Sequence, residues 1–235
     1  MDENRWERYG AAAGIAFAVL VLISFFMVPS PPHVDAGFRK IGDYYANHRR
    51  AILTSNVIGT FGALAFIWFL GHLRHVLNRA EGGVEALSPI VYGAGIAAIV
   101  VGILAAIPAT VLAYSAQEEA INSNAGIVRL LWDMNTVMYS LLFLTMGLFA
   151  AAAALAMVRK ELVGPWLGWV GIGVTALAWT SGTAGFYVTK YSGFWTGFTI
   201  VAIVAFVAWV LLASVVMLRR PEVERAAAWE PVFAH

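Results

Sequence analysis

Long apolar runs separated by short charged segments constrain this chain more than any other feature of its sequence. Six runs cover roughly residues 10–28, 52–73, 88–113, 127–158, 164–188 and 195–218. A helix that crosses a bilayer needs about 20 mostly apolar residues. None of the runs has the period-two alternation of outer-membrane barrel strands. The sequence therefore predicts an all-α fold, a polytopic transmembrane helix bundle with six spans, in which residues 1–235 form a single integral membrane domain.

The composition agrees with this class and excludes several functions. Asp, Glu, Lys and Arg make up only 12% of the 235 residues, against about 25% in a typical soluble domain. The formal net charge of +1 gives no basis for nucleic-acid binding. The absence of cysteine excludes thiolate catalysis and cysteine-based metal sites, and His72 and His75 have no third candidate ligand nearby in the sequence. We therefore expect no cofactor, no metal and no nucleic-acid partner.

The basic residues near the ends of the runs predict an orientation. Cytoplasmic loops of membrane proteins carry an excess of Lys and Arg. If the N-terminus is cytoplasmic, nine of the 15 basic residues lie on the inner side and six on the outer side. The sequence thus favours cytoplasmic positions for both termini. Four of the six outer residues lie in the first loop, between runs one and two, which is the exception to the rule.

The first outer loop contains the pattern of a short amphipathic helix. Phe38, Ile41 and Tyr45 are spaced as one helical face, while Arg39 and Asp43 form an i,i+4 pair on another. We expect this helix to lie at the outer membrane interface. Two interpretations stay open: a brace at the membrane surface, which we favour, and a lid over a site.

Small residues at four-residue spacing indicate close helix packing. Gly10–Gly14 and Gly164–Gly168 are G-x-x-x-G pairs, which allow helix backbones to approach each other in lipid. We expect contacts within one bundle, with a homo-oligomer interface as the alternative.

Polar side chains gather in the outer halves of the predicted spans, whereas the inner halves are almost purely apolar. Polar groups that face lipid are costly, so we expect these side chains to face the bundle interior or one another. The bare inner halves count against a continuous ion pathway. The pattern predicts an outward-facing polar and aromatic pocket whose candidate ligand-binding residues are Asn56, Thr60, Trp132, Asn135, Thr136, Tyr139, Trp179, Thr180, Thr183, Tyr187 and Trp195.

Asp133 is the only acidic residue well inside a predicted span. One interpretation is a structural ion pair with Arg129, one turn away, with Asn135 or Asn56 as amide partners. The other is a functional carboxyl group that orients a ligand or donates a proton to it, because acidic residues inside membranes are often functional. Asp133 is therefore the candidate catalytic residue if the protein is an enzyme.

Two motifs resemble a known family. The sequence W-F-L-G-H-L-R ends the second run at residues 68–74, and P-W-L-G-W opens the fifth run at residues 165–169. Together with the Tyr-rich outer helix, they resemble the DUF4386-like group of uncharacterised six-span membrane proteins common in actinobacteria, although the Arg that this group has after the Pro is absent here. The resemblance implies the six-span topology and a bacterial plasma membrane as the location. It implies no activity.

Three functions from different classes are compatible with these features. The first is a binding protein that holds a hydrophobic or isoprenoid-like small molecule, alongside membrane lipid, in the outer pocket. The second is a membrane-embedded isoprenoid (terpene) cyclase that uses Asp133 as proton donor, with aromatic rings that stabilise a cation. The third is a structural or assembly subunit of a membrane complex.

Overall fold

The computed structural model describes residues 3–81, 87–118, 124–160, 165–188 and 193–219, and within these ranges every regular element is an α-helix, as predicted. Each predicted run falls almost entirely within one long helix, and the short helix predicted in the first loop is also present. The helices are α1 (Glu3–Met27), α2 (Phe38–Asn47), α3 (Arg49–Glu81), α4 (Ser88–Tyr114), α6 (Ala125–Lys160), α7 (Pro165–Tyr187) and α8 (Gly193–Arg219).

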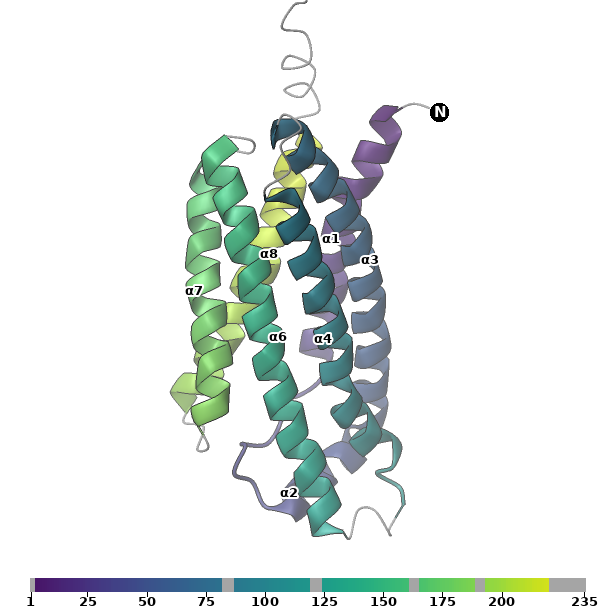
Figure 1. The fold of residues 1–235 in the computed structure, drawn as a ribbon. Helices are drawn as coiled ribbons and strands as arrows, with labels where there is room; N and C mark the ends of the chain where they lie inside the picture. Colours follow the sequence, from purple (N-terminus) through teal and green to yellow (C-terminus); the bar gives the residue numbers. More distant parts are fainter. Residues whose placement is uncertain (1–2, 82–86, 119–123, 161–164, 189–192, 220–235) are drawn as a thin grey trace, which may run out of the picture.

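The long helices pack side by side in a ring (Figure 1). Going round the ring, α1 contacts α3, α3 contacts α4, α4 contacts α6, α6 contacts α7, α7 contacts α8, and α8 returns to α1. Successive long helices run in opposite directions, so α3, α6 and α8 begin at the same end as α2. We call this end of the bundle the α2 end.

The centre of the ring is filled by aromatic side chains. Phe17, Phe66, Phe149, Phe206 and Trp209 come from α1, α3, α6 and α8, and all are buried. Their ring centroids lie 4.4 Å apart for Phe17 and Phe66, 5.4 Å for Phe66 and Phe149, and 6.1 Å for Phe149 and Trp209. Aromatic pairs favour separations of about 4.5–7 Å. The middle of the bundle is thus a packed apolar core, which agrees with the apolar inner halves seen in the sequence.

Glycines allow the close helix contacts within this bundle. A Cβ atom added to Gly10 would collide with His72, and one added to Gly14 would collide with Phe69 and Ser214. Gly168 likewise lies against the α6 backbone, while Gly164 is outside the described residues. The described glycines of these pairs therefore serve packing within one chain, as we expected.

Within the described ranges, five helical segments are long and apolar enough to cross a membrane: Tyr9–Met27, Arg49–Arg79, Ser88–Tyr114, Ala125–Arg159 and Gly193–Arg219. The chain is a multi-pass membrane protein. The helix α7 is not among these segments, although it packs against α6 and α8 in the same ring. Its sequence is interrupted by Gly, Thr, Ser and Trp residues, which score low on hydropathy scales.

The helix α2 is docked on the bundle by its apolar face. Ile41 and Tyr45 are almost fully buried, in a cluster with residues of α3, α4 and α6 that includes Ile52, Leu112 and Trp132. The predicted amphipathic face is confirmed, because its apolar residues are buried against the ends of neighbouring helices. The position of this helix at the outer membrane interface, and the choice between a brace and a lid, stay predictions.

Candidate functional site

The predicted ligand-binding residues fall into two groups at the α2 end. The first group lies on α3 and α6, near α4, and the second lies on α7 and α8. The first group is Asn56, Thr60, Trp132, Asn135, Thr136 and Tyr139, and the second group is Trp179, Thr180, Thr183, Tyr187 and Trp195.

The two amides of the first group are used in contacts between helices. Asn56 Nδ2 donates a hydrogen bond to Thr110 Oγ1 at 2.6 Å, and Asn135 Nδ2 donates to the Ala105 carbonyl oxygen at 3.0 Å. Both bonds join α4 to a neighbouring helix, with Asn56 on α3 and Asn135 on α6. Polar bonds of this kind hold membrane helices together. These two amides therefore contribute to the structure of the bundle.

The two threonines of the first group bond within their own helices. Thr60 donates to the Asn56 carbonyl oxygen at 2.8 Å and Thr136 donates to the Trp132 carbonyl oxygen at 3.2 Å. A threonine satisfies its hydroxyl in this way without a ligand. Tyr139, in contrast, is exposed on the surface of α6.

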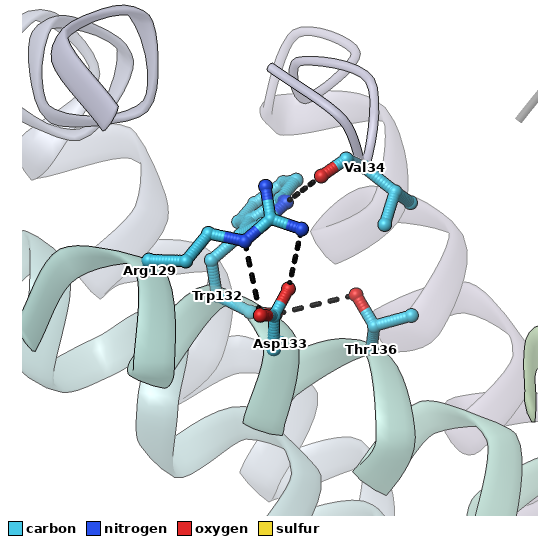
Figure 2. Close-up of polar contacts among 5 residues, drawn as sticks. All are labelled: Val34, Arg129, Trp132, Asp133 and Thr136. Carbon is cyan, nitrogen blue, oxygen red and sulfur yellow. Dashed lines mark hydrogen bonds and ion pairs between the residues drawn. The ribbon is translucent and has the colours of Figure 1, made fainter. Parts of the chain in front are cut away.

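Asp133 forms an ion pair with Arg129 along α6 (Figure 2). Arg129 Nε donates to Asp133 Oδ2 at 2.9 Å, and an Arg129 terminal nitrogen lies 2.9 Å from Asp133 Oδ1. The side chains are 48% exposed for Asp133 and 42% for Arg129. The pair is the one the i,i+4 spacing predicted. The predicted amide partners are wrong, because Asn56 and Asn135 bond to α4.

Trp132 connects the same turn of α6 to the first loop. Its indole Nε1 donates to the Val34 carbonyl oxygen at 3.2 Å, and its ring packs edge-on against Tyr45 of α2 at 6.2 Å (Figure 2 shows the first contact). Trp132 is buried. Trp132, which we had placed in a ligand pocket, therefore helps to attach both the loop and α2 to α6.

Burial changes the pKa of the two tyrosines of α2. Loss of hydration raises the pKa of Tyr44 to about 12, and raises the pKa of Tyr45 still further. Tyr44 donates a hydrogen bond from its hydroxyl to the Pro29 carbonyl oxygen at 2.7 Å. Both tyrosines are therefore neutral structural groups at physiological pH.

The second group lines a shallow, open groove of about 400 Å³ between α7 and α8. All five of its members contribute, and Ala184 is a sixth lining residue. The indole Nε1 of Trp179 donates to the Leu144 carbonyl oxygen at 3.2 Å, which fixes the ring at the α6–α7 contact. Within the described residues, the hydroxyls of Thr180 and Thr183 have no hydrogen-bond partner. The groove therefore combines aromatic surface with unused hydroxyl groups.

The face of α7 that carries these threonines is turned away from the bundle core. Thr180 and Thr183 are exposed, as is Tyr187, whose exposed fraction is 81%. Our expectation that the polar residues of this span face the interior is therefore wrong for these three residues, although it is right for Ser181, which is buried. The reason is the opposite face, where Gly171 and Gly182 approach α8 and α6 so closely that a Cβ atom would collide. Close packing of the glycine face turns the threonine face outward.

Ala184 is the one groove residue that the sequence analysis missed. It has no polar group, so a search for polar side chains passes over it. Its position one turn after Thr180, next to Thr183, was the available signal.

Comparisons with known proteins provide no family assignment. No protein-family model, no curated protein and no solved structure matches the chain. The described residues also contain no group of three or more His, Asp or Glu side chains placed to hold a metal ion. The candidate site therefore rests on its own geometry.

Proposed function

We propose that this multi-pass membrane protein binds a hydrophobic or isoprenoid-like small molecule in the groove between α7 and α8. The observation that carries the proposal is the contrast between the two groups of candidate residues. Asn56 and Asn135 are already bonded to α4, whereas Thr180 and Thr183 have hydroxyls that no described residue bonds. A ligand with one polar end would satisfy those hydroxyls.

The lining of the groove suits such a molecule. Trp179, Tyr187 and Trp195 offer aromatic surface, and Ala184 leaves space between them. Small-molecule sites are mostly apolar, with a few placed polar groups and volumes of about 300–1,000 Å³. The groove is open, so a long apolar chain would lie along it and continue into the surrounding lipid.

The same proposal includes six spans with both termini in the cytoplasm. The helix α6 ends opposite the α2 end and α8 begins at the α2 end, and this arrangement supports α7 as the sixth span. Exposed aromatic side chains lie near its two ends, Trp166 and Trp169 at one and Tyr187 at the other. Trp and Tyr favour the two interfaces of a membrane. The excess of Lys and Arg at the end opposite α2 supports its cytoplasmic position.

The resemblance to DUF4386-like proteins supports a bacterial plasma membrane as the location. The matching motif at residues 68–74 lies in the half of α3 that is further from the α2 end, and the motif at 165–169 opens α7 at the same end of the bundle. The two motifs therefore share the proposed cytoplasmic half of the molecule, away from the groove.

The proposed cyclase reaction has less support than the binding function. Asp133 is not among the groove residues, and both its oxygens contact Arg129. The proposed function is therefore the binding of a small molecule, and the proposed site is the groove.

Native mass spectrometry of the full chain tests the proposal, with geranylgeraniol as the probe. We expect the protein to retain one geranylgeraniol. A neutral hydrogen bond contributes about 1 kcal/mol, or roughly fivefold in affinity, so a Thr180→Val/Thr183→Val variant should retain it at least about fivefold less. The matched control is Thr54→Val, since Thr54 is exposed on α3 outside the groove. Equal retention by the double variant and the control would refute the proposal.

A further inference from the structure

The elbow formed by residues 38–50, where α2 ends and α3 begins, concentrates positive charge. It contains Arg39, Lys40, Arg49 and Arg50, against the single acid Asp43. Arg39, Lys40 and Arg50 are exposed, and Arg49 is half-buried. Such a concentration is unusual on the side of a membrane protein that the other basic residues mark as extracytoplasmic. It therefore needs a physical reason.

These four cations have no ion-pair partner within the described residues. Arg39 lies over the neighbouring Phe38 ring, with its guanidinium carbon 5.9 Å from the ring centroid, and does not pair with Asp43. Arg129 shows the contrast, because it holds Asp133 through two contacts. The four side chains thus have charge and donor capacity that the protein itself does not use.

Arg49 has an additional unmet requirement. Its Nε is buried and has no hydrogen-bond acceptor in the described part of the chain. An arginine carries five N–H donors in a fixed planar arrangement that matches phosphate oxygens. A buried donor without an acceptor is costly. An anion would form charge-assisted bonds with the remaining N–H groups of this guanidinium and with its neighbour Arg50.

The position of the elbow indicates where such an anion comes from. The apolar segment of α3 that is fit to cross the membrane begins at Arg49, so the elbow lies where the apolar thickness ends. The helix α2 is held there rigidly, because Ile41 and Tyr45 are buried against the bundle. Its charged face therefore lies next to the end of the apolar segment, and lipid headgroups are found where such a segment leaves the apolar layer of a membrane.

We propose that the elbow at residues 38–50 is a binding surface for the phosphate groups of anionic membrane lipids. Arg49 and Arg50 hold the phosphate at the boundary between apolar and polar layers, and Arg39 and Lys40 add attraction from the exposed side of α2. A basic residue near an anionic membrane surface contributes attraction equivalent to about a fivefold change in affinity. This surface is separate from the groove between α7 and α8, so either site is able to exist without the other.

Lipid retention by the full chain tests this proposal. The purified protein is incubated with phosphatidylglycerol or with phosphatidylcholine, and bound lipids are counted by native mass spectrometry. We expect phosphatidylglycerol to be retained preferentially. An Arg39→Gln/Lys40→Gln variant, which changes only exposed side chains, and an Arg49→Gln/Arg50→Gln variant should each lose that preference by about tenfold or more. The matched control is Arg159→Gln/Arg219→Gln, which removes two exposed cations at the opposite end of the bundle.

Three outcomes would overturn the proposal. The first is equal retention of the two lipids by the unmodified protein. The second is an undiminished preference in the Arg39→Gln/Lys40→Gln variant, which is expected to fold even if the variant at Arg49 does not. The third is complete displacement of phosphatidylglycerol by an equal concentration of inorganic phosphate, which would identify a site for soluble phosphate.

Discussion

The indole ring of Trp179 on α7 occupies the space beside Gly147 on α6, where a Cβ atom would collide with it. The same ring donates its Nε1 hydrogen bond across the helix contact to the Leu144 carbonyl oxygen, and its other side lines the groove between α7 and α8. One glycine on a neighbouring helix thus sets the position of an aromatic wall of the candidate site.

Replacement of this glycine should disturb both packing and the groove. In Gly147→Ala the added methyl group displaces Trp179, and forced overpacking costs about 1–3 kcal/mol. We expect a loss of that size in the free energy of unfolding, measured by denaturation in mixed micelles, together with weaker geranylgeraniol retention. The matched control is Gly173→Ala on α7, where the added carbon meets no other described part of the protein within 4 Å, apart from the adjoining residues and backbone of its own helix. Unchanged stability and retention in Gly147→Ala would contradict this role for the glycine.

The Arg129–Asp133 pair should contribute little to stability. Both side chains are close to half exposed, and screened pairs of this kind contribute about 0–1 kcal/mol. We expect Asp133→Asn to change the free energy of unfolding by no more than about 1 kcal/mol, and to leave geranylgeraniol retention as it was. If the variant folds normally but no longer retains the probe, the binding site is at Asp133 on α6 and not in the groove. That result would favour a function that depends on the acid.

The Asn56–Thr110 hydrogen bond should contribute more to stability than the Arg129–Asp133 ion pair does. It joins α3 to α4 at 2.6 Å, and hydrogen bonds between membrane helices contribute about 0.6 kcal/mol on average and up to about 1.7 kcal/mol. We expect Asn56→Ala to lower the free energy of unfolding within that range. Thr60→Ala is the control, since the Thr60 hydroxyl bonds only within α3. Equal effects of the two substitutions would show that the bond between the helices contributes no more to the free energy of unfolding than a bond within one helix.

The attachment of α2 should weaken at alkaline pH. Burial raises the pKa of Tyr44 to about 12 from its ordinary value of 10.0. The folded state therefore holds the proton more tightly than the unfolded state. The contribution of this group is complete below pH 10 and is lost as the pH rises towards 12. Proteolytic cleavage in the first loop should increase over this window.

A Tyr44→Phe variant separates this effect from general alkaline damage. It removes the titrating hydroxyl and its hydrogen bond to Pro29, so its cleavage should be faster at neutral pH and less dependent on pH between 10 and 12. An unchanged pH profile in Tyr44→Phe would assign the alkaline transition to another group.

The helices could be predicted from the sequence because their signals are local. An apolar run of sufficient length forms a helix in a membrane, since every backbone group has to be bonded within the segment. The amphipathic spacing of Ile41 and Tyr45 likewise identified α2 and its buried face. The i,i+4 spacing identified the pair of Arg129 and Asp133 in the same way.

The orientation of α7 could not be predicted because small residues occur on both of its faces. Gly171 and Gly182 lie on the packed face, whereas Gly173 lies on the exposed face with the threonines. Helical spacing alone does not tell which face packs, since that depends on the shapes of α6 and α8. The acceptors of Asn56 and Asn135 could not be predicted either, because both acceptors lie on α4, far away in the sequence from the asparagines.

The most direct test of the central claim is photo-crosslinking from two positions on α7. A benzophenone side chain is placed at Tyr187, an aromatic lining residue of the groove, or at Gly173, on the same helix face but outside the groove. We predict that the Tyr187 position gives a single crosslinked adduct with the mass of one geranylgeraniol, while Gly173 gives only the mixture of surrounding lipids. Identical adducts from the two positions would show that the groove holds nothing beyond bulk lipid, and would contradict the account.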